Sequence, residues 1–360
     1  MNLFKYVFKK SDGREWVQYS LHPFPDEFKI KDEGLVRPAD WSPPTLRFHR
    51  MRGEWVAISP SRNARPFLPP KEYCPLCPVT TFGVDPNGVQ IKTDVPIASA
   101  PYEWAVFENM FPGVAMGEKT GFAEVILYSP EHQDTLAGSS LTQIEGLVHI
   151  WRDRSKTVGA MPGIEQVFIF ENKGKEVGVT LHHPHGQLYA FNHIPPFIAA
   201  ELKASKEFYD KNKTCLQCDE IENEKSDKRR IVFENASMIA WIPEAARYPY
   251  EVHIASKEHR ALIEDLNDLE AHDLAEAIKA VLTKYDKLLN IRFPYLMVHH
   301  QAPHSLAKCD YYHWHIEFYP PYRMKDKLKY LAGVESGTGL FINDTIPEEK
   351  AAELRNLEWK

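Results

Sequence analysis

The chain has 360 residues, and 43% of them are hydrophobic, as in an ordinary soluble globular protein. This length favours two domains. The formal net charge of −7, without any stretch rich in Lys and Arg, argues against a nucleic-acid-binding protein. Charged residues interrupt the N-terminal sequence from Lys5 onward, and no segment reaches the ~18 uncharged apolar residues of a membrane span. We therefore expect a cytoplasmic protein without a signal peptide or a membrane segment.

Residues 1–44 are polar, aromatic and proline-bearing, and they show no strong hydrophobic period. We expect them to form an arm packed on the surface. Residues 55–60 then have the composition of a strand that ends in a turn. Two arginines, Arg62 and Arg65, follow this strand, and their guanidinium groups are suited to phosphate oxygens. Such a pair is also common on a solvated surface.

Four of the five cysteines form two pairs with the same spacing. The pairs are Cys74-Pro-Leu-Cys77 and Cys215-Leu-Gln-Cys218, and Cys309 stands alone. In a reducing compartment, pairs of this kind indicate bound zinc and not disulfides.

An internal repeat organises the chain. Residues 106–109 (VFEN) recur as residues 232–235, and the Glu-Val and Ser-x-Glu-His motifs of residues 124–132 recur in residues 251–259. Each copy begins with a CxxC pair and closes with His-x-His, at His183-Pro-His185 and His313-Trp-His315. The repeat therefore predicts two units of similar plan.

Each copy also contains one amphipathic stretch, residues 141–155 and 266–289, and a later apolar run, residues 166–170 and 295–298. Near-helical spacing of the apolar residues predicts a helix packed on a sheet, to which the apolar runs contribute strands. We therefore predict an α+β fold with two domains, residues 1–197 and 198–360. The charged residues 220–230 are predicted to form an exposed, mobile loop.

Both copies carry the ligands of a closed metal site. A Cys pair on a tight turn, together with two histidines, gives a tetrahedral zinc site without an open position, which indicates a structural role. Buried free thiols are the alternative. The predicted ligands are Cys74, Cys77, His132 and His183 in the first copy and Cys215, Cys218, His259 and His313 in the second.

The predicted chemistry lies in residues 183–187, His-Pro-His-Gly-Gln. Side chains alternate between faces in an extended segment, so His183, His185 and Gln187 are expected on one side. With His183 on zinc, His185 is a free imidazole, which is a good nucleophile towards phosphorus at neutral pH. The Gln187 amide is a donor for the charge that develops in a phosphoryl transition state. The alternative is an ordinary half-buried strand with hydrogen-bonded histidines.

These residues resemble the galactose-1-phosphate uridylyltransferase family, which belongs to the histidine triad superfamily. The resemblance covers roughly residues 55–343, and its most specific element is residues 183–187. It also includes residues 59–65, 129–132, 170–174 and 318–321 and the pair Cys74 and Cys77. It implies two tandem histidine-triad-like repeats, each an antiparallel half-barrel sheet with packed helices.

The resemblance further implies a ping-pong exchange, in which His185 takes a uridylyl group from UDP-glucose and delivers it to galactose 1-phosphate. It implies a homodimer with active sites assembled between subunits. Gln187 would be the second catalytic residue, and by motif position the residues in contact with nucleotide or phosphates would be Arg62, Arg65, Asn109, Asn172, Lys173, Gly178, Thr180, Gln187 and Lys329. Met110 replaces an aspartate that the family often has near the nucleoside.

Some members of the family bind a second metal on a glutamate and three histidines, and the counterparts here are Glu201, His300, His315 and Glu317. Because this chain carries a complete second Cys/His set, we predict two zinc ions per chain, with iron at the glutamate-containing site as the alternative. His315 and Glu317 also occupy, in the second copy, the positions of His185 and Gln187. The charge of Glu317 would repel a diphosphate, so this second row is predicted to be inactive.

Three other functions stay open. An ADP-sugar phosphorylase would use the same chemistry with a different donor. A nucleotide hydrolase of the superfamily usually has a histidine at the position of Gln187, and an amide does not replace it as an acid. A zinc-ordered binding or scaffold protein would need no free imidazole beside a metal-bound one.

Overall fold

The computed structural model describes residues 1–32, 34–37, 41–64, 68–69, 71–78, 93–99, 102–115, 121–306 and 308–360. The chain divides into two compact units. Unit 1 comprises Met1–Thr135 and Val179–Asn192, and unit 2 comprises Leu136–Gly178 and His193–Lys360. The domain limits that we inferred from the repeat, residues 1–197 and 198–360, stay a prediction.

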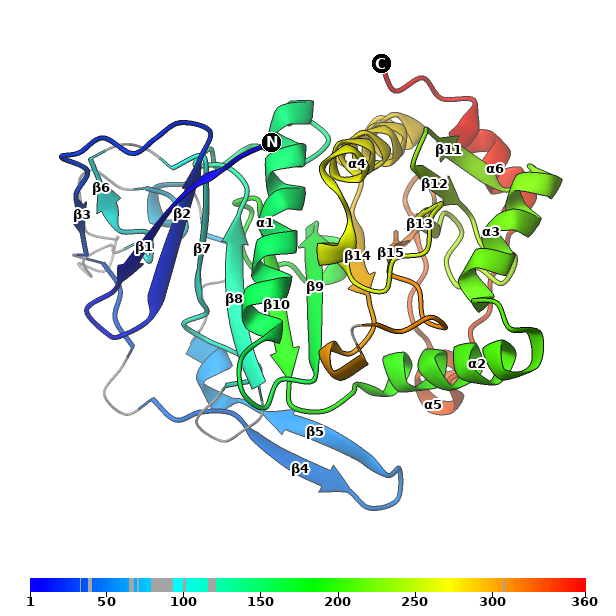
Figure 1. Ribbon diagram of the computed structural model, residues 1–360, viewed down its shortest axis with the longest axis horizontal. Helices are drawn as coiled ribbons and strands as arrows, with labels where there is room; N and C mark the ends of the chain where they lie inside the picture. The colour runs from blue at the N-terminus through cyan, green and yellow to red at the C-terminus, as the bar shows by residue number, and fades with distance from the viewer. Residues whose placement is uncertain are drawn as a thin grey trace. The chain divides into compact units, whose positions relative to one another are not determined.

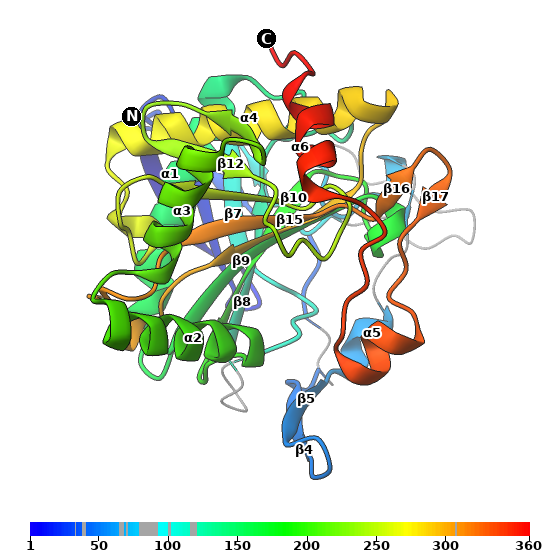
Figure 2. The same cartoon turned by 90° about the vertical axis from the view of Figure 1, so that its right-hand side faces the viewer.

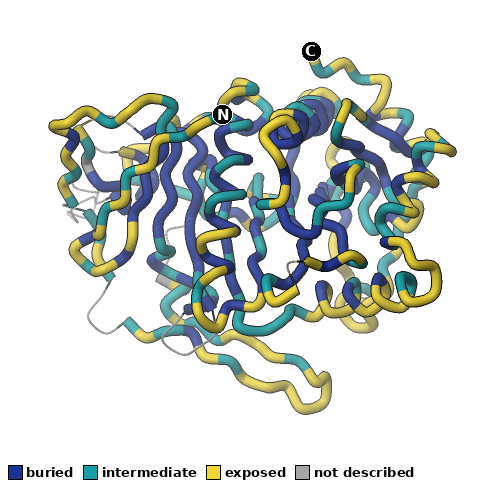
Figure 3. Tube along the Cα trace, in the orientation of Figure 1, coloured by how far each residue is buried: buried dark blue, intermediate teal, exposed yellow. Residues whose placement is uncertain are grey.

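Unit 1 is built on antiparallel strands in the order β1-β2-β7-β8-β10 (Figure 1). Their bounds are β1 Phe4–Lys9, β2 Glu15–Ser20, β7 Trp104–Glu108, β8 Gly121–Leu127 and β10 His185–Phe191. Two short antiparallel pairs accompany them, β3 Ile30–Lys31 with β6 Ile97–Ala98 and β4 Thr45–His49 with β5 Glu54–Ile58. The short helical turns η1 Pro60–Ala64 and η2 Lys71–Tyr73 follow β5. The β4–β5 hairpin is mostly exposed, whereas β7 and β8 are buried (Figure 3).

The N-terminal arm, residues 1–44, was expected to pack on the surface, but part of it belongs to the sheet and to the core of unit 1. β1 and β2 form a hairpin, and β2 pairs with β7 with Trp16 opposite Phe107. Trp16, Val17 and Tyr19 are buried. The arm therefore supplies part of the core of unit 1.

Unit 2 contains antiparallel strands in the order β9-β14-β15-β13-β12-β11. Their bounds are β9 Gln166–Lys173, β14 Tyr295–His300, β15 His315–Tyr319, β13 Val252–Ser256, β12 Met238–Trp241 and β11 Ile231–Glu234. A short hairpin pairs β16 Tyr322–Met324 with β17 Lys327–Leu328. The helices are α1 Leu141–Gly159, α2 Pro196–Asn212, α3 Leu216–Asp227, α4 Asp268–Leu289, α5 Gly333–Thr338 and α6 Pro347–Arg355, and the helical turns are η4 Lys175–Val177, η5 Ile263–Asp265 and η6 His304–Leu306.

The two amphipathic stretches form α1 and α4, as the sequence predicts. Asn267 accepts from the backbone N–H of Glu270, whose carboxylate accepts from the backbone N–H of Asn267, and this capping box begins α4. Leu274, Ile278 and Val281 recur at helical spacing on its buried face. α4 packs against α1 and against β11, β12 and β13. The predicted α+β class is thereby confirmed.

The charged residues 220–230 do not form a loop, and that expectation is wrong. Residues 220–227 belong to α3 (Figure 2). Within this helix, Ile221 and Glu224 are buried. Arg230 follows the helix and is buried between two carboxylates, with its Nη2 2.7 Å from Glu224 and its Nη1 2.7 Å from Glu348. Because Arg230 and Glu224 neutralise each other, both can be buried, although charged residues in a sequence usually indicate exposure.

The two copies of the repeat place their last motif alike. In unit 1, β10 pairs with β8, and His185 lies opposite Leu127. In unit 2, β15 pairs with β13, and His315 lies opposite Ala255. Each histidine is the first residue of its strand. Among the described residues, no helix has the length and apolar character needed to cross a bilayer.

Candidate active site and metal centres

A cavity of about 310 Å³ lies in unit 1 beside the start of β10. His185 and Gln187 line it, together with Asn109 and Thr180. Along β10, exposure alternates with a period of two, which places His185 and Gln187 on one face and Leu188 on the buried opposite face. The structure thus places two members of the predicted row at one cavity. The third, His183, precedes the strand and is buried in a cluster with two cysteines.

One hydrogen bond fixes the tautomer of His185. Its Nδ1 lies 2.8 Å from the backbone carbonyl oxygen of His183. A carbonyl oxygen only accepts, so Nδ1 carries a proton, and in the neutral ring the lone pair is on Nε2. Burial lowers the pKa of His185 below its ordinary value. The ring is therefore a neutral imidazole at neutral pH with a fixed tautomer.

Asn109 fixes the orientation of the Gln187 amide. The backbone N–H of Phe111 donates to Asn109 Oδ1 over 2.8 Å, which turns Asn109 Nδ2 towards Gln187. That nitrogen donates to Gln187 Oε1 over 3.2 Å. The donor group of Gln187, Nε2, consequently points away from Asn109. A ligand of the cavity that carries negative charge is a suitable acceptor for it.

The first predicted metal set comes together in unit 1. Cys74, Cys77, His132 and His183 are buried, with their ligand atoms within 4.8 Å of one another. Cys77 Sγ lies 3.2 Å from His132 Nδ1 and 3.4 Å from His183 Nδ1. A tetrahedral zinc ion separates its sulfur and nitrogen ligands by about 3.5 Å, given bonds of ~2.3 and ~2.0 Å. His183 Nε2 donates to the Ser129 carbonyl over 2.9 Å, which leaves Nδ1 for a metal.

The second set in unit 2 has the same design. Its members Cys215, Cys218, His259 and His313 also lie within 4.8 Å of one another. Cys218 Sγ lies 3.6 Å from His259 Nδ1 and 3.4 Å from His313 Nδ1. On the far side of the rings, His259 Nε2 donates to the Cys309 carbonyl over 2.9 Å, and His313 Nε2 lies 3.0 Å from Ser256 Oγ. Both sets thus present two sulfurs and two Nδ1 atoms.

One cysteine of each pair is ionised without a metal. The hydrogen bond from Cys77 lowers the pKa of Cys74 to about 4, and the hydrogen bond from Cys218 lowers that of Cys215 to about 2. The same contacts, with burial, raise the pKa values of Cys77 and Cys218. The two sulfurs of each pair therefore share one proton unless a cation replaces it, and the residues fit a zinc ion.

The alternative set, Glu201, His300, His315 and Glu317, also comes together, with ligand atoms within 4.8 Å. Here the carboxylates already have partners. Glu201 accepts from His300 Nδ1 at 2.9 Å, and Glu317 lies 3.3 Å from His315 Nε2. Arg247 Nη2 donates to Glu317 over 2.9 Å. These pairs satisfy the charges within the protein, which favours an ion-pair network here.

The same network explains why the two histidines of the repeat differ. His315 Nδ1 donates to the His313 carbonyl over 3.0 Å, as His185 does to that of His183. Its Nε2, however, faces Glu317. Burial lowers the pKa of His315, but the hydrogen bond and charge of Glu317 outweigh this effect and raise it to about 9. His315 is thus protonated at neutral pH and has no lone pair for nucleophilic attack.

The remaining predicted contact residues fall in several places. Arg62 lies on η1 in unit 1, and its Nη1 donates over 3.0 Å to the hydroxyl of Tyr189, on the same face of β10 as His185. In unit 2, Asn172 and Lys173 end β9, and Lys173 Nζ lies 3.3 Å from Asp286. Arg65 lies outside the described residues.

Two further predicted residues of unit 2 have well-defined surroundings. Gly178 ends η4 with a φ of +78°, a left-handed conformation that glycine adopts without strain. Lys329 is buried, and its Nζ donates to Glu335 over 3.1 Å and to the Ile342 carbonyl. The cavity itself brings together His185, Gln187, Asn109 and Thr180 from the predicted set.

Sequence reasoning missed much of the apolar lining. The cavity is also lined by Leu35, Val36, Pro75, Leu76, Phe107 and Val125, and by Met110, which the resemblance had placed near the nucleoside. Leu76 lies between Cys74 and Cys77, so its place in a predicted metal motif could have indicated that it lies near the site. Leu35 and Val36 belong to the N-terminal arm, whose lack of periodicity gave no indication of a place at the site.

Comparison with known proteins confirms the resemblance. The family model "Galactose-1-phosphate uridyl transferase, N-terminal domain" matches residues 102–195, and the corresponding C-terminal-domain model matches residues 201–360. Galactose-1-phosphate uridylyltransferase of Thermotoga maritima is 36% identical over 329 residues, which cover 87% of this chain and 98% of the relative. The chain belongs to the galactose-1-phosphate uridylyltransferase family.

Two further comparisons also extend over most of this chain. A solved uridylyltransferase structure superposes with a TM-score of 0.75 at 34% identity, covering 86% of this chain and 97% of that chain. ADP-glucose phosphorylase of Arabidopsis thaliana is 26% identical over 342 residues, covering 87% of this chain and 93% of the relative. The likeness thus spans nearly all of each relative.

Proposed function

We propose that this protein is a nucleotidylyltransferase that exchanges UMP between UDP-glucose and galactose 1-phosphate through a covalent uridylyl group on His185. The observation that carries the proposal is the fixed neutral tautomer of His185 at a cavity that Gln187 also lines. Relatives named galactose-1-phosphate uridylyltransferase support the substrate pair.

The chemistry uses the free Nε2 atom of His185. Nε2 forms a bond to the α-phosphorus of UDP-glucose, and the bond from that phosphorus to the bridging oxygen breaks, so glucose 1-phosphate leaves with the electron pair. The ring keeps its Nδ1 proton and becomes positively charged, and the His183 carbonyl that accepts this proton's hydrogen bond stabilises the charge. A phosphate oxygen of galactose 1-phosphate then attacks the same phosphorus, which releases Nε2 and forms UDP-galactose.

Gln187 has the role of stabilising the transition state. Its amide orientation, set by Asn109, directs the donor group to an anionic ligand. We expect Gln187→Ala to slow transfer by roughly 10- to 1,000-fold, the usual effect of removing one oxyanion donor. The measurement is the single-turnover rate of label transfer from UDP-glucose to the protein. Gln143→Ala, at the start of α1, is the control and should keep the normal rate. A normal rate in Gln187→Ala would contradict this role.

We propose that each Cys/His set binds one zinc ion with every coordination position filled by the protein. Such an ion supplies rigidity. In unit 1 it would fix the ring of His183, whose backbone carbonyl sets the tautomer of His185. Iron on the glutamate-containing set stays the alternative for a second metal.

The proposed assembly is a homodimer. The β4–β5 hairpin and its turn expose Phe48, Met51, Trp55 and Val56, and Met51 is 95% exposed. Exposed apolar side chains gathered on one hairpin are typical of a protein interface. We also propose a cytoplasmic location, which the five free cysteines support.

The alternative donor is ADP-glucose, because one relative is an ADP-glucose phosphorylase. Incubation of the purified enzyme with nucleotide-labelled UDP-glucose and ADP-glucose in parallel tests the proposal. We expect stoichiometric, acid-labile label from UDP-glucose, mapped to His185 by mass spectrometry, and release of that label by galactose 1-phosphate. Label from ADP-glucose alone, released by inorganic phosphate, would assign the phosphorylase activity instead.

A further inference from the structure

The N-terminal arm contributes directly to the cavity that contains His185. Leu35 and Val36 of the arm line this cavity, together with Phe107 from β7 and Val125 from β8. Residues 1–101 lie outside both matched family models, which cover residues 102–195 and 201–360. The arm is therefore a part of the site whose role the family models do not describe.

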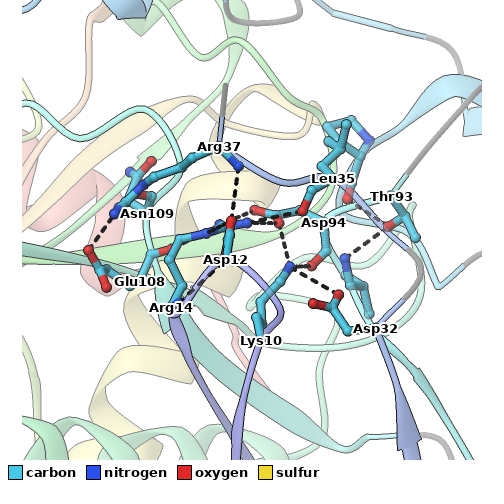
Figure 4. Close-up of polar contacts among 12 residues, drawn as sticks. Lys10, Asp12, Arg14, Asp32, Leu35, Arg37, Thr93, Asp94, Glu108 and Asn109 are labelled. Carbon is cyan, nitrogen blue, oxygen red and sulfur yellow. Dashed lines mark hydrogen bonds and ion pairs between the residues drawn. The ribbon is translucent and has the colours of Figure 1, made fainter. Parts of the chain in front are cut away.

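Arg14 anchors the arm at the cavity (Figure 4). Its side chain is buried with 0% exposure, and its two terminal nitrogens donate to the two carboxylate oxygens of Asp94 over 2.9 and 2.7 Å. The same nitrogens reach the carbonyl oxygens of Leu35 at 3.3 Å and Glu108 at 3.2 Å. Lys10 adds a second cation, with Nζ 2.6 Å from Asp94. One buried ion cluster thus joins the hairpin, the Leu35 backbone and the end of β7.

Arg37 fastens the other end of the same segment. Its backbone N–H donates to Asp12 over 3.0 Å, and its Nη2 donates to Glu108 over 2.8 Å and to the Asn109 carbonyl over 2.9 Å (Figure 4). Asn109 is the residue that orients the Gln187 amide. Arg37 therefore contacts Asn109, and Asn109 in turn contacts Gln187 at the proposed reaction centre.

Gly34 allows the backbone to approach closely. A Cβ atom at this position would lie 2.3 Å from the Thr93 carbonyl oxygen, so any other residue would push the segment away. The backbone N–H of Leu35 donates to that same oxygen over 2.9 Å. Leu35 is thereby held by its N–H on one side and by its carbonyl oxygen, through Arg14, on the other.

The lining has two kinds of surface. His185, Gln187, Asn109 and Thr180 are polar, whereas Leu35, Val36, Leu76, Phe107 and Met110 offer an apolar surface suited to the flat faces of a base. Asp94 also lines the cavity, but Arg14 and Lys10 already hold both of its oxygens. Asp94 is therefore not available to read the base, and the apolar part of the lining selects by shape. The volume of about 310 Å³ is at the lower end of the ~300–1,000 Å³ of small-molecule pockets, so each side chain in the wall matters.

We infer that the N-terminal arm determines the nucleotide specificity of this enzyme: Leu35 and Val36, held in place by Arg14 and Arg37, form a wall of the nucleoside subsite that favours a pyrimidine over the larger purine. This inference rests on the proposed function. Val36 lines the cavity and is 50% exposed, so part of its side chain is available to a ligand.

The test is the double variant Leu35→Ala/Val36→Ala, assayed with UDP-glucose and ADP-glucose. Removing methyl groups from a pocket wall changes discrimination by roughly tenfold or more. We expect the ratio of kcat/KM for UDP-glucose to that for ADP-glucose to fall at least about tenfold, mainly through KM. The single variant Val36→Ala changes a half-exposed side chain, keeps the fold, and should shift the ratio in the same direction.

The matched control is Val7→Ala, because Val7 is in the same arm on β1 and is 54% exposed. Its ratio should equal that of the unchanged enzyme. A ratio within twofold of normal in both the double and the single variant would overturn the inference. Dissociation constants of UMP and AMP, measured by calorimetry on the same variants, show the effect of Leu35 and Val36 on nucleotide binding independently of catalysis. If the unchanged enzyme labels from ADP-glucose alone, the proposed function fails, and the UMP/AMP ratio still decides the role of the wall.

Discussion

Replacement of His185 by alanine is expected to abolish nucleotide exchange, with a fall in kcat of roughly 10⁴- to 10⁶-fold, as for removal of a nucleophile in other covalent enzymes. The reason is that Nε2 of this ring is the atom with a fixed lone pair at the cavity. The measurement is steady-state exchange of label between UDP-glucose and glucose 1-phosphate. Zinc content and melting temperature should not change, because the His185 side chain lies outside both Cys/His sets.

Two comparisons make this result specific. His182→Ala removes an exposed imidazole three residues away and should retain normal exchange. His185→Gly leaves a space of the size of an imidazole, so it should regain partial turnover with uridylyl-imidazolide as a preformed donor. Covalent label on the His185→Ala protein, or label that maps to His315, would show that the nucleophile is assigned wrongly.

Replacement of Cys215 by serine is expected to remove one of two zinc ions per chain and to lower the melting temperature by on the order of 10 °C. Loss of a structural ion costs several kcal/mol of folding free energy, and each kcal/mol shifts the melting temperature by ~2–4 °C in a domain of this size. The chemistry should suffer less, because this set lies in unit 2 and His185 lies in unit 1. Elemental analysis and calorimetry provide the two measurements.

The control for this variant is Cys309→Ser, since Cys309 is also a buried thiol of unit 2 but lies outside the ligand set. It should keep two zinc ions. If the unchanged protein, purified without added metal, holds one zinc ion or holds iron, the second Cys/His site is wrong and the set containing Glu201 and Glu317 becomes the second metal site. An unchanged melting temperature in Cys215→Ser would lead to the same conclusion.

Part of the fold could be predicted because the helix and the strand that follows it occur in both copies of the repeat. The amphipathic period of residues 266–289 identified α4 almost to the residue, since its buried positions recur every three or four residues. The two metal-ligand sets could also be predicted, because four ligands, two Cys and two His, recur in the same order in both copies. The position of His185 and Gln187 on one face followed from the two-residue period of a strand.

The elements that sequence reasoning missed, β1, β2 and α3, depend on contacts between residues that are distant in the sequence. β1 and β2 carry mixed polar and apolar residues, and their order comes from pairing with β7, some 90 positions later, and from the buried Arg14–Asp94 pair. The helix α3 was missed for a related reason. Arg230, which follows the helix, is buried against Glu224 of α3 and against Glu348, and the local pattern gives no indication of this second, distant partner.

The pairing of β2 with β7 also protects the protein from aggregation. β7, Trp-Ala-Val-Phe-Glu, is almost entirely buried and apolar, and without the arm it would present an unpaired edge of backbone groups to other chains. The arm replaces that edge with β1, which ends the row of strands described in unit 1 and carries Lys5 and Lys9. Lysines on an outermost strand discourage the addition of a further strand from another molecule. The arm that reaches the cavity through Leu35 and Val36 therefore also covers, through β1 and β2, an edge at which further strands could add.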